Sequence, residues 1–256
     1  MASKIVALIT GANGGIGFET VKALAATSSN YHVLLGSRSV EKGQQALREI
    51  HDALGDSVKA AISVIQIDVC DKKSIETTKE AIEAQFGKLD VLINNAGIMT
   101  YQETDTMISL RSTFETNVFG QLVITETLEG LLQKSAKPYV IYVSSMQGSI
   151  TQRLNPQYRY YQVRGDHYRM SKAALNMLAA CHRHNFAEWG CKVLSFNPGY
   201  CVSNLTGEEG RKVREKDKAL HPSVPANVLV DILMGKRDED IEKNGMVDVD
   251  GGIAPW

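Results

Sequence analysis

The chain has 256 residues, of which 43% are hydrophobic and 22% charged, enough for one large globular domain with a sizeable core. Its 28 basic and 29 acidic residues nearly balance, which argues against nucleic acid or an anionic membrane as the main partner. The four cysteines form no CxxC pair, and no apolar run approaches a membrane span or a signal-peptide core. We therefore expect a cytoplasmic protein with no metal site, no membrane span and no nucleic-acid partner.

Short apolar runs alternate with amphipathic segments along the chain. Six runs rich in Val, Ile and Leu predict buried parallel strands, at residues 4–10, 32–37, 63–68, 90–95, 139–144 and 192–197. Apolar residues three and four apart predict helices between them, including residues 15–28, 41–54 and 73–87. The pattern predicts an α/β fold, a doubly wound parallel sheet of about seven strands with helices on both faces. No linker or repeat divides the chain, so residues 1–256 are predicted to form one domain.

The first strand runs into the glycine-rich sequence TGANGGIG at residues 10–17, and a helix follows at once. Such glycines allow a tight turn and a close approach of the backbone to a pyrophosphate, which the helix N-terminus attracts. A glycine-rich loop alone can be a simple structural turn, but the strand-loop-helix context indicates a dinucleotide site in a Rossmann domain. Its predicted contacts are Gly11, Asn13, Gly15, Ile16 and Gly17.

The end of the second predicted strand bears on the choice of cofactor. About 20 residues after the glycine loop, NAD sites usually carry an acidic residue that binds the ribose, whereas an arginine accommodates the NADP phosphate. Here the sequence is LGSRS at residues 35–39, with no acid. Ser37 and Arg38 suit a phosphate, so we predict NADP(H). The alternative is that Arg38 is an ordinary surface arginine.

Three motifs in order, TGxxxGxG, NNAG at residues 94–97 and a YxxxK, resemble the short-chain dehydrogenase/reductase family in its single-domain branch. The resemblance covers nearly the whole chain. It implies four catalytic residues, Asn117, Ser145, Tyr168 and Lys172. It also implies that the cofactor is contacted by Asp68, Val69, Asn95, Ala96, Gly97, Tyr168, Lys172, Pro198, Gly199, Cys201 and Ser203. Cys201 and Ser203 depart from the family's usual residues, Val or Ile and Thr, but Ser203 keeps the hydroxyl.

The segment YRYYQVRGDHYRMSK at residues 158–172 contains four tyrosines, so the catalytic one must be chosen. A phenol titrates near 10, and a nearby cation stabilises its anion. On a helix the cation belongs four residues further on, and only Tyr168 has a lysine there, Lys172. Tyr160 with Arg164 is the runner-up, but arginine does not release a proton. We therefore predict that Tyr168 is the proton donor.

The interval from Ser145 to Tyr168 is 23 residues, whereas shorter members of the family have about 13. We infer an insertion at residues 149–167, similar to that of carbonyl-reductase-like members. Its tyrosines and arginines either form a substrate wall or simply pack over the catalytic helix. A second substrate-side segment, 200–222, contains the charged stretch 206–222, by default a solvated face or mobile loop. Because the insertion could block a dimer interface, the choice between monomer and homo-oligomer stays open.

The expected reaction is NADPH-dependent reduction of a ketone or aldehyde. The resemblance implies that Tyr168 protonates the alkoxide and Ser145 donates a hydrogen bond to it. Lys172 would lower the pKa of Tyr168 and orient the ribose, and Asn117 would kink its helix and hold a water. The alternatives are NADP-dependent oxidation of an alcohol, reduction of an imine and, less favoured because all four catalytic residues are present, a non-catalytic NADP-binding regulator. The identity of the small-molecule carbonyl or alcohol substrate is not predicted.

Overall fold

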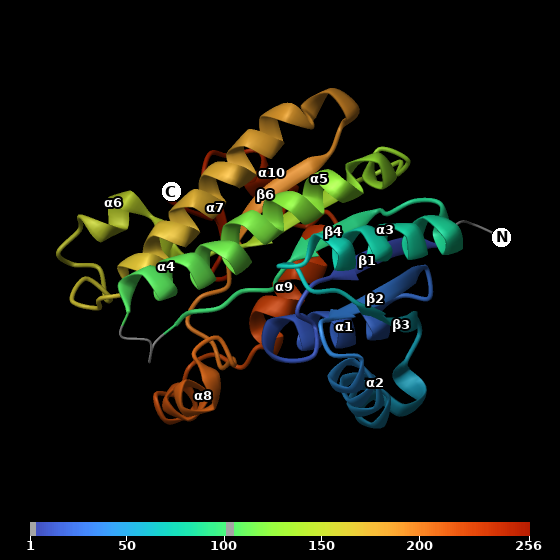
Figure 1. Ribbon diagram of the computed structural model, residues 1–256, viewed down its shortest axis with the longest axis horizontal. Helices are drawn as coiled ribbons and strands as arrows, with labels where there is room; N and C mark the ends of the chain where they lie inside the picture. Colours follow the sequence, from blue (N-terminus) through green and yellow to red (C-terminus); the bar gives the residue numbers. More distant parts are fainter. Residues whose placement is uncertain (1–3, 101–104) are drawn as a thin grey trace.

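The structure, a computed structural model, describes residues 4–100 and 105–256, which form an eight-stranded sheet between layers of helices (Figure 1). The strand order is β3-β2-β1-β4-β5-β6-β7-β8. Every neighbouring pair is parallel except β7 and β8. The order reverses between β1 and β4, which confirms the predicted doubly wound parallel sheet.

All six predicted strands are present, with ends shifted by two residues at most. The strands are β1 (Ile5–Ile9), β2 (Tyr31–Ser37), β3 (Ala61–Gln66), β4 (Val91–Asn94), β5 (Tyr139–Val143), β6 (Lys192–Asn197), β7 (Met246–Asp248) and β8 (Ile253–Ala254). The largest shift is in β3, where Gln66 pairs with the last residue of β2 and the chain then turns away. The last two strands are too short to show a periodicity, and only their pairing defines them.

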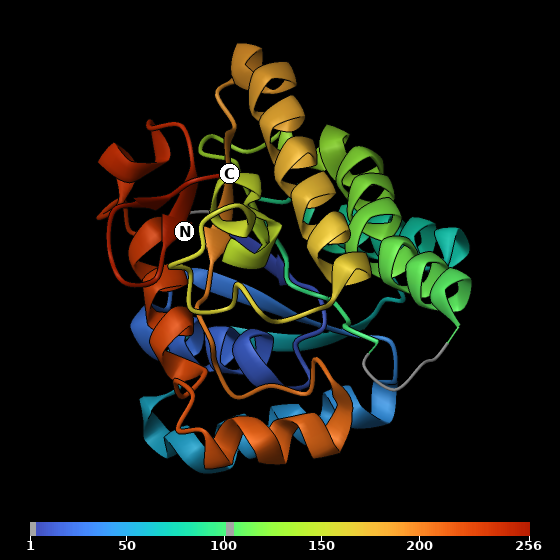
Figure 2. The ribbon, with the colours of Figure 1, turned by 90° about the vertical axis from the view of Figure 1, so that its left-hand side faces the viewer.

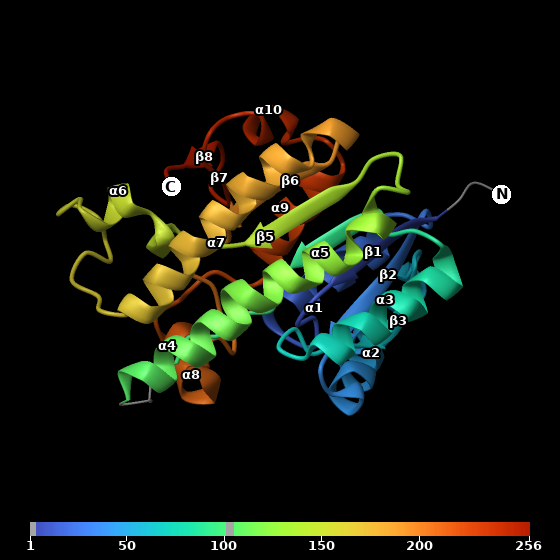
Figure 3. The same cartoon turned by 45° about the horizontal axis from the view of Figure 1, so that its top comes forward.

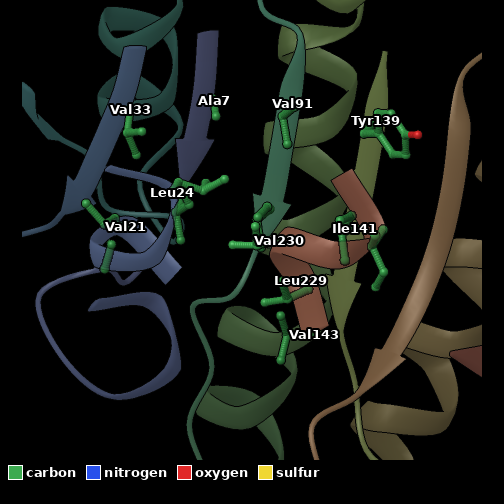
Figure 4. Close-up of a cluster of buried hydrophobic side chains, with 14 of the residues drawn as sticks. Ala7, Val21, Leu24, Val33, Val91, Tyr139, Ile141, Val143, Leu229 and Val230 are labelled. Atoms are coloured by element: carbon green, nitrogen blue, oxygen red, sulfur yellow. The ribbon is translucent and has the colours of Figure 1, made fainter. Parts of the chain in front are cut away.

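The helices cover both faces of the sheet. One face carries α1 (Gly15–Thr27), α2 (Val40–Leu54) and α9 (Ser223–Leu233), whose apolar residues join those of the strands in one core cluster. Figure 4 shows part of it, with Val21 and Leu24 of α1 near Leu229 and Val230 of α9. The other face carries α3 (Lys72–Phe86), α5 (Gly120–Leu132) and α7 (Asp166–Asn185) over a second cluster. Figure 3 shows α5 and α7 running side by side with α4 (Thr106–Phe114) leading into α5.

The carboxyl ends of the strands are flanked by the two segments predicted to lie on the substrate side (Figure 2). The insertion begins with α6 (Ile150–Arg153) and continues in turns to the start of α7. The hydroxyl of Ser149 donates a hydrogen bond to the carbonyl of Trp256, which ties the last residue to this segment. After β6 the chain forms α8 (Gly207–Lys216), and a further short helix, α10 (Asp238–Ile241), precedes β7.

The default interpretation of residues 206–222 as a loop is wrong, because ten of them form α8. The solvated part of that interpretation is confirmed, since α8 contains no buried residue. Ion pairs one turn apart stabilise the helix, Lys212 with Glu209 at 2.9 Å and Arg211 with Glu215 at 3.0 Å. Among the described residues no helix is long and apolar enough to cross a membrane, and no group of side chains could hold a metal ion.

Two glycines of α5 allow a direct test of its packing. A Cβ at Gly120 would lie 3.0 Å from the carbonyl carbon of Val69 and closer still to its oxygen, so Gly120→Ala should destabilise the fold. We expect a loss of about 1–3 kcal/mol in the free energy of unfolding, because overpacking displaces the backbone. Gly130 is exposed with no heavy atom within 4 Å of its virtual Cβ. Gly130→Ala, the matched control, should gain about 0.5–1 kcal/mol in urea unfolding. Equal stabilities of the two variants would contradict the packing argument.

Candidate active site

A single continuous cavity of about 810 Å³ runs along the carboxyl edge of the sheet, from the glycine loop to α8. The residues predicted from the sequence gather on its walls. Those that line it are Gly11, Asn13, Gly15, Ile16, Ser37, Arg38, Asp68, Val69, Asn95, Ala96, Gly97, Ser145, Tyr168, Lys172, Pro198, Gly199, Cys201 and Ser203. Gly17 and Asn117 lie behind the walls and support them, as described below.

The glycine loop has the geometry of an anion site. Gly11 and Gly15 have positive φ angles of +61° and +57°, which favour glycine. The helix α1 begins with no side chain capping its first N–H groups and no acidic residue in its first turn. Its N–H donors and positive dipole end therefore face the cavity, and a pyrophosphate fits there. Gly17 has a packing role, because a Cβ would lie 2.9 Å from the Cα of Ala12.

The NNAG segment holds this loop in place. The Asn95 amide donates to the carbonyl oxygens of Thr10 and Gly11, at 2.7 and 3.3 Å. The hydroxyl of Thr10 accepts hydrogen bonds from the backbone N–H groups of Asn95 and Ala96, both at 3.0 Å. The side chain of Asn95 therefore joins the ends of β1 and β4, and Asn95, Ala96 and Gly97 line the cavity.

A basic corner lies where β2 meets α2. The buried hydroxyl of Ser37 donates to the carbonyl of Ser39 at 2.8 Å, whereas Arg38 is exposed on the cavity wall. Ser39 and Lys42, which the sequence analysis missed, also line this corner. Ser39 caps α2 by accepting from the N–H of Lys42 at 3.2 Å. The serine cap and the lysine one turn later were the signals that could have identified them.

The predicted pair Asp68 and Val69 lies on the cavity wall in the turn after β3. The Asp68 carboxylate accepts a hydrogen bond from the N–H of Cys70 at 2.9 Å, and the Ser74 hydroxyl bonds the N–H of Asp68 at 2.9 Å. Val69 is buried. This turn after β3 is therefore held in one conformation against the cavity.

Ser145, Tyr168 and Lys172 meet at the end of β5. Tyr168 and Lys172 are one turn apart on α7, and both are buried, with exposed fractions of 5% and 4%. The Lys172 ammonium nitrogen donates to the carbonyl of Val143 at 2.8 Å and lies 5.7 Å from the centre of the Tyr168 ring. Ser145, just beyond β5, lies close enough to the Tyr168 hydroxyl to lower the pKa of that phenol. The structure thus places a hydroxyl, a phenol and an amine together on the wall of the cavity.

Burial sets the protonation of both groups on α7. It raises the pKa of Tyr168 to about 12, and the Ser145 hydrogen bond and the Arg214 charge oppose this rise. Burial lowers the pKa of Lys172 to about 7. The effect of Lys172 on the pKa of Tyr168, expected from the sequence, stays a prediction.

Asn117 lies in a π-helical turn, Glu115–Phe119, that interrupts the helix between α4 and α5. The side-chain oxygen of Asn117 accepts a hydrogen bond from the N–H of Ile98 at 2.8 Å. Its side-chain nitrogen donates to the carbonyl of Ile98 at 2.9 Å and to the hydroxyl of Ser171 at 3.1 Å. Asn117 therefore ties the chain after β4 to the catalytic helix. The expected kink corresponds to this π-helical turn, whereas the expected water stays a prediction.

The insertion is a fixed wall and not only a covering of α7. Tyr158 and Tyr160 line the cavity. Arg169, buried on α7, donates to the carbonyl of Tyr160 at 2.8 Å and to that of Val163 at 3.0 Å. Tyr161 packs instead beside Arg153, whose guanidinium donates to its carbonyl at 2.6 Å. The insertion therefore both lines the cavity and packs on α7, whereas its contact with a substrate stays a prediction.

The wall opposite the insertion comes from residues 200–222. The ring centres of Tyr160 and Tyr200 lie 6.0 Å apart, and the Arg214 guanidinium lies 5.0 Å from the centre of the Tyr200 ring. Sequence reasoning missed Tyr200 and Arg214 as cavity residues. No local pattern identifies them, because α8 brings Arg214 to the cavity only through the turn of the chain after β6.

A doubly wound sheet with an anion-binding glycine loop and a Ser–Tyr–Lys group at its carboxyl edge defines a nucleotide-dependent oxidoreductase of the short-chain type. The sequence profile of the short chain dehydrogenase family matches residues 5–214, and the chain belongs to that family. It is 30% identical to the short-chain dehydrogenase/reductase tropE of Talaromyces stipitatus, over 100% of this chain and 99% of that protein. It is 35% identical to the short-chain dehydrogenase anuI of Penicillium roqueforti, over 84% and 85% of the two chains.

The fold is also similar to that of solved structures. The NADPH-bound carbonyl reductase from chicken fatty liver superposes with a TM-score of 0.75 over 100% of both chains, at 23% identity. At this level of identity the likeness concerns the fold alone.

The buried amine makes a pH-dependent stability prediction. The pKa of Lys172 is about 7 in the folded protein against 10.5 as its ordinary value, so between these pH values the unfolded chain binds more protons. The free energy of unfolding should therefore rise with pH, by at most about 1.4 kcal/mol per pH unit from this group. Lys172→Met should lose this contribution. Urea unfolding at pH 6.5, 8 and 9.5 measures it, with Lys137→Met, at an exposed lysine, as the control. Parallel pH profiles for wild type and Lys172→Met would contradict the prediction.

Proposed function

We propose that this protein is an NADPH-dependent reductase of ketones or aldehydes. The observation that carries the proposal is the meeting of Ser145, Tyr168 and Lys172 in the same cavity as the glycine loop and Arg38. A cavity that continues from an anion-binding loop to a phenol can hold a dinucleotide with its reactive end beside a proton donor.

The cavity residues fit the parts of such a cofactor. The loop of Gly11 and Gly15 with the α1 N-terminus would hold the pyrophosphate, and Asp68 would lie beside the adenine. Arg38, together with Ser39 and Lys42, would bind the 2′-phosphate that distinguishes NADP from NAD. Pro198, Gly199, Cys201 and Ser203 would line the nicotinamide end. The NADPH of the chicken carbonyl reductase is consistent with this choice.

The residues around Tyr168 would complete the reaction. Bound NADPH would supply the hydride to the carbonyl carbon. Tyr168 would then donate its phenolic proton to the substrate oxygen, and Ser145 would donate a hydrogen bond to the same oxygen, as an oxyanion stabiliser does. The Lys172 ammonium, close to the ring, would favour the phenolate that results and bind the ribose with its remaining N–H groups. Burial of Tyr168 and Lys172 would limit their contact with water during the proton transfer.

Removal of one hydroxyl tests the proton donor. Tyr168→Phe should lower kcat for an accepted carbonyl substrate by about 10²–10⁴-fold, the usual contribution of a positioned acid, with NADPH binding retained. The control is Tyr161→Phe, because that ring packs beside Arg153. Steady-state kinetics gives kcat, and NADPH fluorescence titration gives the binding. Near-wild-type turnover by Tyr168→Phe would refute the mechanism.

A charge reversal tests the cofactor. Arg38→Asp should raise the KM for NADPH by about 10–100-fold, since a charged contact to the phosphate is lost and an acid opposes it, and should improve the use of NADH. Arg48→Asp is the matched control, because Arg48 is an exposed arginine of α2 away from the cavity. Two results would show that Arg38 has no role in selecting the cofactor. One is equal use of NADH and NADPH by the wild type, and the other is the same KM for NADPH in Arg38→Asp and Arg48→Asp.

A further inference from the structure

One arginine of α8 differs from the other charged residues of that helix. Arg211 and Lys212 are exposed and form ion pairs with glutamates of the same helix. Arg214 is half-buried and lines the cavity. Its guanidinium lies 5.0 Å from the centre of the Tyr200 ring.

Most N–H donors of the Arg214 guanidinium have no hydrogen-bond partner within the described residues. Within residues 4–100 and 105–256 it forms no ion pair, and its one hydrogen bond, to the carbonyl of Cys201, is 3.5 Å long. A guanidinium carries five N–H donors in a planar fork. A partly buried cation that is stacked on a tyrosine and hydrogen-bonded at only one weak contact is suited to bind an anionic ligand group.

Arg214 lies within electrostatic reach of the predicted proton donor. Burial raises the pKa of Tyr168 and that of Cys201, and the charge of Arg214 lowers both. Asp217, an acid that also lines the cavity, accepts a hydrogen bond from the Tyr200 hydroxyl at 3.2 Å. The other charged side chains of the cavity around this end are Arg159, Lys218, Asp248 and Asp250. Asp248 is held by the N–H of Asp250 at 3.1 Å and by the Asn197 amide at 3.4 Å.

Aromatic rings from both walls meet beside Arg214. Tyr160 lies 6.0 Å from Tyr200 and 5.6 Å from Tyr158 between ring centres. The carbonyl groups around Tyr160 are fixed by Arg169, so this ring is presented by an ordered turn. Within the described chain the buried Tyr160 hydroxyl has no hydrogen-bond partner. Such rings favour a flat, unsaturated ligand.

We propose that the substrate is an aromatic aldehyde or ketone that also carries a carboxylate, with Arg214 binding the carboxylate and Tyr160 and Tyr200 contacting the ring. The inference rests on the proposed function, because it places the carbonyl group at Tyr168. It names the class of substrate that the walls select. Arg38 and Lys42 serve the phosphate at the far end of the cavity, so Arg214 is assigned to the substrate and not to the cofactor.

The test compares an acid with its neutral ester. Wild type, Arg214→Met, Arg214→Lys and Arg211→Met are assayed with NADPH on the carboxybenzaldehydes and on their methyl esters. The acid should be preferred in kcat/KM by wild type, and Arg214→Met should reduce this preference by about 10–100-fold, as expected for a lost charged pair. Arg214→Lys should keep part of the preference, and Arg211→Met, on the solvent side of the same helix, should keep all of it.

An acid-to-ester ratio that Arg214→Met leaves unchanged would overturn the inference. If the KM for NADPH also rose in that variant, Arg214 would be assigned to the cofactor.

A binding measurement separates the inference from the proposed reaction. Titration calorimetry in saturating NADP⁺ compares 2-naphthoate with its methyl ester, neither of which can be reduced at a ketone or aldehyde. Tighter binding of the acid than of the ester, with the difference lost in Arg214→Met, would support the anion site. If the protein at the same time reduced no carbonyl compound, only the proposed reaction would be refuted. Equal binding of acid and ester would refute the anion site whether or not the protein is a reductase.

Discussion

The joint between the carboxyl ends of β1 and β4 is the constraint on which the rest of the site depends. Thr10 accepts hydrogen bonds there from Asn95 and Ala96, at 2.7 to 3.0 Å. The strand order reverses at this point, so helices leave the two strands toward opposite faces and open a crevice between them. The joint holds the glycine loop on one side of the crevice and the NNAG segment on the other. The positions of the loop and of the π-helical turn around Asn117 follow from it.

Burial gives the other end of the cavity its chemical character. The phenol of Tyr168 and the amine of Lys172 are almost fully removed from solvent. Burial raises the pKa of the phenol and lowers that of the amine, so it favours the neutral form of each. Charges and hydrogen bonds around them then act without screening by water. The carbonyl of Val143 and the hydroxyl of Ser145 are therefore strong partners here, and a single guanidinium at Arg214 influences the phenol across the cavity.

Strands and the longer helices could be predicted because their signals are local. A strand buried on both faces is a continuous apolar run, as in β1, β4 and β5, and an amphipathic helix repeats every three or four residues. The helix α8 was missed because it has no buried residue and begins at a glycine, so neither signal exists. Strands β7 and β8 are three and two residues long and depend on their neighbours for every hydrogen bond.

The sequence by itself determined that Tyr168 and Lys172 share one side of a helix, because a spacing of four residues is a property of the helix and needs no tertiary contact. It likewise determined the glycine loop, whose backbone conformation depends on the residues within it. Only the tertiary structure decided that Tyr158 and Tyr160 face the cavity while Tyr161 does not, since Arg153 and Arg169 hold that turn from outside it. It also decided that Arg214 lies beside these tyrosines, because the insertion and α8 come together only at the carboxyl ends of the parallel strands.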